Sequence, residues 1–205
     1  MPSIQPRRAG VLVPVFAIRT PDDLGIGDIG GVRQLIDWAA DTGLGLVQFL
    51  PINATGSDSS PYNAISSVAL DYLTLDLTPQ AVPELDDKFY ATVTGILRAD
   101  LLRQGSVNYP KVRRLKNTLL RRAFSQIETQ PKRMAEFERF CVKEAAWLDD
   151  FCLFKVLMEE HGHEDWTNWR EDLNTAAKAH AWRDASGDEI DDRILFHAYV
   201  QWLCF

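Results

Sequence analysis

The sequence has few cysteines and no long apolar run. Among its 205 residues are three cysteines, Cys141, Cys152 and Cys204, whose odd number and spacing fit neither a disulfide framework nor a zinc site. We expect them to be buried, reduced thiols. No run approaches the roughly 18 consecutive apolar residues that span a membrane, and residues 1–10 lack the apolar segment of a signal peptide. These absences lead us to expect a cytoplasmic protein without a membrane partner.

An excess of basic residues is also missing. Lysine and arginine number 22 against 29 aspartates and glutamates, for a net charge of −7. Proteins that bind phosphate backbones present a basic face, so we expect no nucleic-acid partner. Acidic segments follow the basic cluster between Arg113 and Arg122, and we interpret this cluster as a solvated helix face. Of the residues of the chain, 46% are hydrophobic and 25% are charged. This share of hydrophobic residues is enough to form a buried core.

The rest of the chain is organised around residues 46–77. They open with the apolar run from Leu46 to Ile52 and change at once to a polar loop, residues 53–63, rich in turn-forming residues. An apolar run bounded by such residues is typical of a strand buried on both faces of a parallel sheet. Ligands of such sheets bind beyond the carboxyl ends of the strands, so this loop is the candidate site. Tyr62 is its only aromatic residue.

Residues 10–52 predict a strand–helix–strand unit. The first apolar run, residues 10–16, contains Pro14, which removes one donor from the strand ladder. A helical pattern follows and ends at Gly43, a residue suited to the left-handed conformation at a helix end. Its apolar positions have the spacing i, i+3, i+4 and i+7: Val32, Leu35, Ile36 and Ala39. With the second run, this pattern is typical of a βαβ unit with a parallel strand pair.

Three glycines before this helix, Gly25, Gly27 and Gly30, match the G-x-G-x-x-G pattern of dinucleotide-binding proteins. The first of them, however, lies nine positions past Phe16 instead of directly after the strand. The second strand also ends in residues 51–53 without the acidic residue that binds a ribose hydroxyl. We favour the interpretation that the glycines shape a turn into the helix, and nucleotide binding is the alternative.

The pattern after residue 77 is helical. Residues 72–77 alternate as a short strand, and helical segments follow over residues 89–102, 112–124 and 131–160. The longest segment has one apolar stripe, which core packing explains and for which a partner-helix groove is the alternative: Met134, Phe137, Cys141, Ala145, Leu148, Phe151, Cys152 and Met158. A last segment, residues 188–205, is helical with one apolar face: Ile190, Ile194, Ala198, Trp202 and Phe205. It stops without a helix-ending residue, so we expect the chain to be cut within or just after this helix.

Two side-chain clusters after residue 160 have both a structural and a binding interpretation. His161 and Gly162 suit a helix cap, and with His163 and nearby glutamates a metal site is the alternative, although no third ligand falls at a helical spacing. Tryptophans in the next segment suit the anchoring of a helical layer, with sugar stacking as the alternative: Trp166, Trp169 and Trp182. We favour the structural interpretation of both clusters and expect no metal or other cofactor.

Four stretches of the sequence resemble the N-terminal portion of the 4-alpha-glucanotransferases, also called amylomaltases or disproportionating enzymes, of glycoside hydrolase family 77. They are GVLVPVFAIRTPDDLGIGDIG at residues 10–30, DWAADTGLGLVQFLPINATGSDSSPYNAISSVALDYL at 37–73, KEAAWLDDFCLFKVLMEEHG at 143–162 and FHAYVQWLCF at 196–205. The second stretch is the most specific, because LP, a TG-containing loop, SPY, a small-residue helix and YL occur together at the family's spacing.

The resemblance implies an α/β fold, namely an incomplete (β/α)8 TIM barrel with a mainly helical insertion. Residues 1–77 would hold the first βαβ part and the sugar-site loop, residues 78–185 the helical insertion, and residues 186–205 a helix that returns to the barrel. Such barrels need about 250 residues and eight strands, so we expect this chain to have unpaired strand edges and exposed apolar faces.

The resemblance also implies transfer of alpha-1,4-glucan segments between maltooligosaccharides by a retaining double displacement. The family's catalytic aspartate nucleophile, glutamate acid/base and second aspartate lie on later strands and map to none of residues 1–205. Tyr62 matches the SPY tyrosine that stacks on the sugar beside the scissile bond, and Ser60 and Asn63 flank it with hydrogen-bonding groups. A core tyrosine is the alternative for Tyr62. Many short bacterial members have another tyrosine where this chain has Ser57.

Two other functions fit the same residues. One is a non-catalytic glycan-binding or interaction module that is complete at 205 residues. The other is an alpha-amylase-like hydrolase, which would pass the glycan to water instead of to a sugar hydroxyl. The oligomeric state is open in all three.

Overall fold

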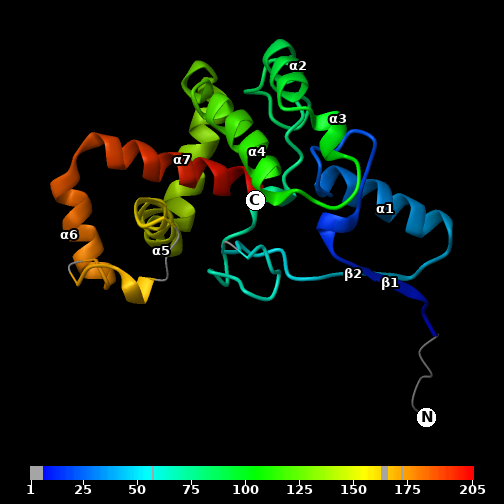
Figure 1. Cartoon of the computed structure of the whole chain (residues 1–205), viewed down its shortest axis with the longest axis horizontal. Coiled ribbons are helices and arrows are strands. Elements are labelled where there is room, and N and C mark those ends of the chain that lie inside the picture. Colours follow the sequence, from blue (N-terminus) through cyan, green and yellow to red (C-terminus); the bar gives the residue numbers. More distant parts are fainter. Residues whose placement is uncertain (1–6, 57, 163–165, 172) are drawn as a thin grey trace.

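The computed structural model describes residues 7–56, 58–162, 166–171 and 173–205. These residues form a mainly helical molecule with one small sheet at one end (Figure 1). The strands are β1 (Gly10–Val13) and β2 (Leu46–Phe49), and the helices are α1 (Ile29–Asp41), α2 (Asp87–Ile96), α3 (Ala99–Leu102), α4 (Tyr109–Phe124), α5 (Pro131–Glu160), α6 (Ala176–Ser186) and α7 (Asp188–Cys204). Among the described helices, none is long and apolar enough to cross a membrane.

The predicted βαβ unit is confirmed. β1 and β2 pair in parallel, with Gly10 opposite Leu46 and Val13 opposite Phe49. Between them, α1 begins after Asp28, whose side chain accepts a hydrogen bond from the backbone N–H of Gly31 at 3.1 Å. Such an N-cap satisfies one of the free N–H groups of the first turn and typically stabilises a helix by about 1 kcal/mol.

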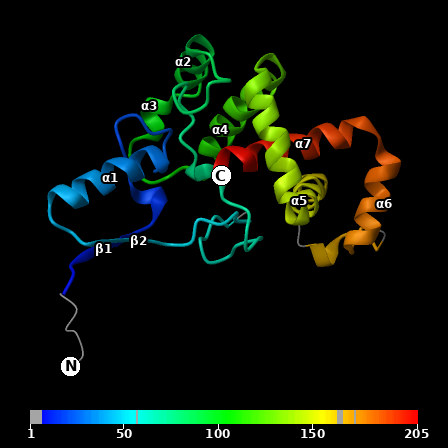
Figure 2. The same cartoon turned by 180° about the vertical axis from the view of Figure 1, so that it is seen from behind.

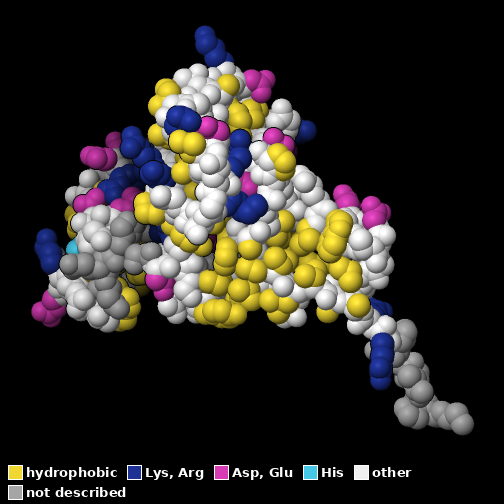
Figure 3. All heavy atoms as spheres, turned by 45° about the vertical axis from the view of Figure 1, so that its right-hand side comes forward, with side chains coloured by type: hydrophobic (Ala, Val, Ile, Leu, Met, Phe, Trp, Pro, Cys, Tyr) yellow, Lys and Arg dark blue, Asp and Glu magenta, His cyan; other side chains and the backbone are white. Residues whose placement is uncertain are grey.

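The prediction that the second strand is buried on both faces is wrong. Leu46 is 56% exposed, and the next residue on the same face, Gln48, is exposed as well. Among the described elements, the sheet has only two strands, and α1 packs against β2. Because few elements pack on this two-stranded sheet, some of its apolar side chains are exposed to solvent. Figure 3 shows hydrophobic side chains gathered on this side, and the exposed ones include Leu12, Ile36, Trp38 and Leu46.

The glycines before α1 serve close packing, as the favoured interpretation expected. A Cβ atom on Gly27 would lie 2.1 Å from the carbonyl oxygen of Val15, a distance that no side chain tolerates. Gly25 has a φ of +91°, in the left-handed region that favours glycine. The pattern that resembles a dinucleotide fingerprint therefore has a structural reason: it lets the turn into α1 lie directly on the segment after β1.

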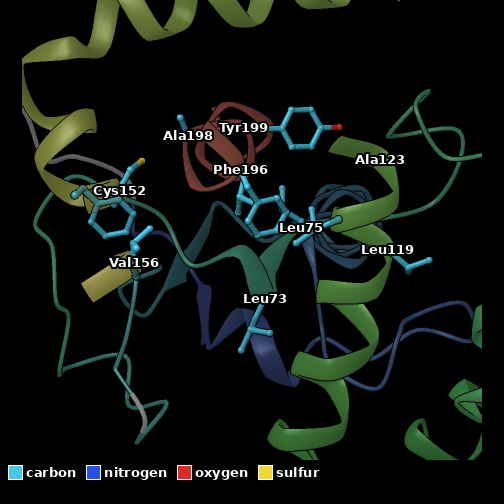
Figure 4. Close-up of a cluster of buried hydrophobic side chains, with 14 of the residues drawn as sticks. Leu73, Leu75, Leu119, Ala123, Cys152, Val156, Phe196, Ala198 and Tyr199 are labelled. Atoms are coloured by element: carbon cyan, nitrogen blue, oxygen red, sulfur yellow. The ribbon is translucent and has the colours of Figure 1, made fainter. Parts of the chain in front are cut away.

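The hydrophobic core lies where α4, α5 and α7 meet the segment after the polar loop (Figures 1 and 2). Figure 4 shows part of this cluster, with side chains from all four segments: Leu73, Leu75, Leu119, Ala123, Cys152, Val156, Phe196, Ala198 and Tyr199. Tyr199 is fully buried, and its ring meets that of Phe137 edge-on at 5.9 Å. The apolar stripe predicted for α5 is mostly buried, but Ala145 is exposed. On α7, the predicted face is buried from Ile190 to Ala198.

The predictions for residues 64–77 and for the basic cluster on α4 need correction. Instead of a strand, residues 72–77 form a short 3-10 helix, Tyr72–Thr74, and an extended tail, and residues 64–69 form bends instead of a small-residue helix. The carbonyls of Leu73 and Leu75 accept hydrogen bonds from the Lys116 ammonium group, both at 2.7 Å, instead of pairing with a strand. Lys116 is fully buried, so the prediction of a solvated helix face is wrong for this residue.

The remaining local predictions concern the end of α5 and the thiols. The Nδ1 atom of His161 lies 2.9 Å from the carbonyl oxygen of Leu157, and Gly162 has a φ of +60°, so the predicted cap is confirmed. His163 lies outside the described residues. Of the three free cysteines, Cys152 is buried and the other two are half-buried. Burial raises the pKa of the Cys152 thiol, which keeps it protonated and unreactive.

Candidate functional site

The polar loop lies at the carboxyl ends of both strands, where parallel sheets place their ligands. In the structure, the loop runs from the end of β2 to residue 71 and contains the polar residues 53–63 defined from the sequence (Figure 1). A small cavity of about 40 Å³ marks this edge, and its lining includes Phe16 after β1, Ile52 after β2, and Ser59 and Pro61 of the loop. The cavity is too small for a sugar, so a ligand here would bind on the outside of the loop.

Backbone hydrogen bonds hold the two arms of the loop together. The N–H of Ala54 donates to the carbonyl of Ala69 at 2.8 Å, and the N–H of Asp71 donates to the carbonyl of Ile52 at 2.9 Å. Between the same arms, the Thr55 hydroxyl donates to the Asp71 carboxylate at 3.0 Å. These bonds fix the base of the loop, from which the tip projects.

The three residues predicted to bind sugar lie together at this tip. Ser60, Tyr62 and Asn63 share one tight turn, in which the N–H of Asn63 donates to the carbonyl of Ser60 at 3.0 Å. The Tyr62 side chain is 72% exposed, so Tyr62 is not a core tyrosine. An exposed phenol ring on a fixed turn offers a flat apolar face with a polar tip, which suits a sugar ring.

Asp58 is a further residue of this turn and was not among the predicted site residues. Its carboxylate accepts hydrogen bonds from the Asn63 side-chain amide and from the N–H of Ser60, the latter at 3.2 Å. The bond from Asn63, followed by that from Ser60, lowers the pKa of the Asp58 carboxyl. An aspartate two positions before a serine in a turn-rich stretch is typical of an Asx-turn, so the pattern could have indicated it. Ser57 lies outside the described residues.

Arg113 of α4 also holds the tip, so the prediction that it lies on a solvated helix face needs correction. Its Nη2 atom donates to the Ser59 hydroxyl at 2.6 Å and to the carbonyl of Gly56 at 3.2 Å. Ser59 has a φ of +56°, a left-handed conformation that costs a residue with a Cβ atom about 1 kcal/mol. The guanidinium contact offsets this cost and stabilises the turn that precedes Tyr62.

Helix α7 supports the other arm. The Gln201 side chain, which is buried, accepts from the N–H of Leu70 and donates to its carbonyl, both at 2.9 Å. A cavity of about 270 Å³ lies between the loop and helices α4, α5 and α7, and its lining includes several charged side chains: Asp71, Arg113, Lys155, Glu159 and His197.

The Glu159 carboxylate lies between His197 and Arg193 in the wall of this second cavity. Burial lowers the pKa of the His197 imidazole, so the ion pair is the one with Arg193. The Nε2 atom of His197 lies 3.1 Å from Oε1 of Glu159, and Arg193 lies 3.1 Å from the same carboxylate. Burial alone would raise the pKa of the Glu159 carboxyl, but the contacts with His197 and Arg193 outweigh it and lower the pKa to about 2. The ion pair between Glu159 of α5 and Arg193 of α7 therefore joins these two helices behind the loop. Among the described residues, no group of three or more His, Cys, Asp or Glu side chains is placed to hold a metal ion.

These features define a class of protein: a mainly helical α/β protein with a parallel βαβ unit and a ligand-facing loop at its carboxyl edge. The family model described as 4-alpha-glucanotransferase matches residues 13–205. The chain belongs to the 4-alpha-glucanotransferase family, which confirms the resemblance found in the sequence.

Individual relatives agree with this assignment. The 4-alpha-glucanotransferase of Chlamydia caviae is 31% identical over 197 residues, which are 96% of this chain and 36% of the relative. That of Synechocystis sp. is 29% identical over 207 residues, which are 97% of this chain and 38% of the relative. The chain thus spans a little over a third of the length of these relatives and resembles their N-terminal part.

Solved structures show the same fold at lower identity. The amylomaltase from Streptococcus agalactiae in complex with acarbose has a TM-score of 0.70 and 22% identity, over 96% of this chain and 39% of that one. The amylomaltase from Corynebacterium glutamicum has a TM-score of 0.74 and 19% identity, over 96% of this chain and 27% of that one. At these low sequence identities, the likeness to the two structures shows a shared fold and nothing more.

Proposed function

We propose that the protein carrying this chain is a 4-alpha-glucanotransferase that moves alpha-1,4-glucan segments between maltooligosaccharides in the cytoplasm. A glucanyl-enzyme ester would form by a retaining displacement, and a sugar hydroxyl would then take the glycan. The carboxylates for these steps would come from outside residues 1–205, and the chemistry requires no cofactor or metal. The observation that carries the proposal is the exposed Tyr62 ring on a braced loop at the carboxyl edge of the strand pair.

The loop would form one wall of a glucan subsite. Tyr62 would stack on the apolar face of a glucose ring, with its hydroxyl directed to the reacting centre. Asn63 uses one amide N–H for Asp58, which leaves its second N–H and its carbonyl oxygen for sugar hydroxyls. Ser60 would contribute its hydroxyl, which accepts a bond from the N–H of Tyr62 at 3.4 Å. The site would thus combine one stacking surface with two hydrogen-bonding groups.

For the fold, we infer a (β/α)8 barrel to which β1 and β2 contribute the first strands. The exposed Leu12 and Leu46 and the single pairing of each strand support this inference, because further strands and helices would cover them. Residues 1–77 would be the barrel part, residues 78–185 the helical insertion, and residues 186–205 a helix that returns to the barrel.

Products formed from maltotriose test the proposed reaction. A transferase converts maltotriose into glucose and oligomers longer than the substrate, because the glycan passes to another sugar. An alpha-amylase-like hydrolase yields only glucose and maltose, and a non-catalytic glycan-binding module leaves maltotriose unchanged. The absence of oligomers longer than maltotriose in an assay of the full-length protein would overturn the proposal.

A further inference from the structure

The polar cavity behind the loop, about 270 Å³ in volume, contains charged groups that the candidate site does not use. It lies between the loop and helices α4, α5 and α7, and the loop runs beside α5 in both views (Figures 1 and 2). A water molecule occupies about 30 Å³ in the liquid, so the cavity has room for a small ion together with several waters. The charges of its wall determine which ion fits.

Lys155 of α5 lines this cavity and is the cation with the fewest partners there. Among the described residues, none forms a hydrogen bond or a close ion pair with its ammonium group. Burial lowers the pKa of the Lys155 side chain, against the opposing effect of the Glu159 charge, because desolvation disfavours the charged form. An ammonium group in such a place costs free energy unless an anion compensates its charge. Lys155 is therefore available to an anion that enters the cavity.

Arg113 of α4 adds a second positive charge to the same wall. Its Nη2 atom donates to the Ser59 hydroxyl and to the carbonyl of Gly56, and the guanidinium group also bonds to the Tyr72 hydroxyl. A guanidinium group carries five N–H donors, so some remain for a ligand in the cavity. The Arg113 charge also contributes to the lowered pKa of Lys155, as expected for two cations that face one cavity.

Two carboxylates line the cavity, and one of them is already neutralised. Glu159 forms an ion pair with Arg193 at 3.1 Å, and Arg193 also contacts Glu160, which is exposed and lies outside the lining. The Asp71 carboxylate accepts a hydrogen bond from the Thr55 hydroxyl but has no ion-pair partner among the described residues. Two cations and one unpaired carboxylate therefore remain, which is a surplus of one positive charge.

We propose that this cavity binds a small oxyanion that has one negative charge and an O–H group, as hydrogen carbonate and dihydrogen phosphate do. Lys155 and Arg113 would donate to its oxygen atoms, and its O–H group would donate to the Asp71 carboxylate. Charge-assisted hydrogen bonds of this kind are about twice as strong as neutral ones. A chloride ion would match the cations but offers no donor to Asp71. The inference does not depend on the proposed reaction, because it uses no group that would contact a glucan.

Calorimetric titration of the full-length protein tests the proposal. Sodium phosphate and sodium hydrogen carbonate are added in separate experiments, each compared with sodium chloride at the same ionic strength. We expect one of the two oxyanions to bind with one ion per chain. Lys155→Met should weaken this binding at least about ten-fold, and Lys155→Arg, which keeps the charge, should stay within about three-fold of the wild type. Lys132→Met, at an exposed position of the same helix outside the lining, is the matched control.

A second variant leaves the half-buried Lys155 side chain in place. Asn117 lines the cavity from an exposed position of α4, so Asn117→Asp adds a repelling charge with little change of shape, and we expect at least about ten-fold weaker binding. Hydrogen exchange locates the ion, because an oxyanion on Arg113 should slow exchange at residues 58–64 in the wild type but not in Lys155→Met. Binding no stronger than that of chloride, or equal oxyanion binding by the wild type, Lys155→Met and Asn117→Asp, would overturn the proposal.

Discussion

Arg113 donates a hydrogen bond to the hydroxyl of Ser59 at 2.6 Å, across 54 positions of the chain. This bond joins α4 to the turn that carries Tyr62, and it acts at Ser59, whose backbone is left-handed. The candidate site is therefore shaped by a helix that the sequence places far from it.

Replacing Arg113 should impair the site without removing any group that touches sugar. A hydrogen bond to a charged group contributes about 1.5–3 kcal/mol, so we expect Arg113→Ala to lower kcat/KM for maltotriose transfer about ten- to a hundred-fold. Hydrogen exchange at residues 58–64 should accelerate in parallel. Arg114→Ala, a change at the exposed neighbouring position, is the control. Equal rates in both variants would show that the loop holds its shape without α4.

Replacing Tyr62 should affect turnover and leave stability unchanged, because its side chain is 72% exposed. We expect Tyr62→Ala to lose about 1–3 kcal/mol of transition-state binding, or roughly ten- to a hundred-fold in kcat/KM. Tyr62→Phe keeps the ring and should retain most of the activity if stacking dominates. Wild-type kinetics for Tyr62→Ala would mean that the ring does not contact the substrate.

Lys116 should make the free energy of unfolding depend on pH in the alkaline range. Burial lowers its pKa from the usual 10.5 to about 8, against the opposing effect of nearby carboxylates such as Asp28. Between these two values the unfolded chain binds the proton and the folded chain does not, so the free energy of unfolding should rise with pH, by roughly 3 kcal/mol at most. Denaturant titrations at pH 8 and 10.5 measure this rise. Lys116→Met should lack it, whereas Lys111→Met, at an exposed position, should retain it.

Gln201 should matter for stability more than its uncharged side chain suggests. Gln201→Ala would leave the N–H and the carbonyl of Leu70 without their partner in a part-buried place, at a cost of about 2–3 kcal/mol in the free energy of unfolding. Gln104→Ala, at an exposed position, should cost almost nothing. Chemical denaturation of the two variants against the wild type gives both values. A loss below about 0.5 kcal/mol for Gln201→Ala would show that water replaces the side chain.

The local features of the fold were predictable because short sequence patterns determine them. The spacing from Val32 to Ala39 predicted α1, and the change of composition after Ile52 predicted where the loop begins. The same patterns placed Tyr62 in that loop, whereas its exposure was open, because a core tyrosine was the alternative. They succeed because helix periodicity and turn chemistry depend on neighbours within a few residues.

What the sequence could not show depends on partners far along the chain. The alternation from Tyr72 to Leu77 is that of a strand, but Lys116 binds the carbonyls that a neighbouring strand would have used. The run from Leu46 to Ile52 suggested a strand covered on both faces, yet coverage depends on which other elements pack there, and Gln48 within the run marks the open face. A polar residue inside an apolar run is the feature that could have indicated it.

The bond between Gln201 and Leu70 also bears on the order in which the site forms during synthesis. The two residues are 131 positions apart, so at about 5–20 residues per second Gln201 emerges roughly 7–26 s after Leu70. During that interval the far arm of the loop has no partner from α7. The newly made loop therefore reaches its final shape only once α7 has been synthesised and has docked, well after the loop's own residues have left the ribosome.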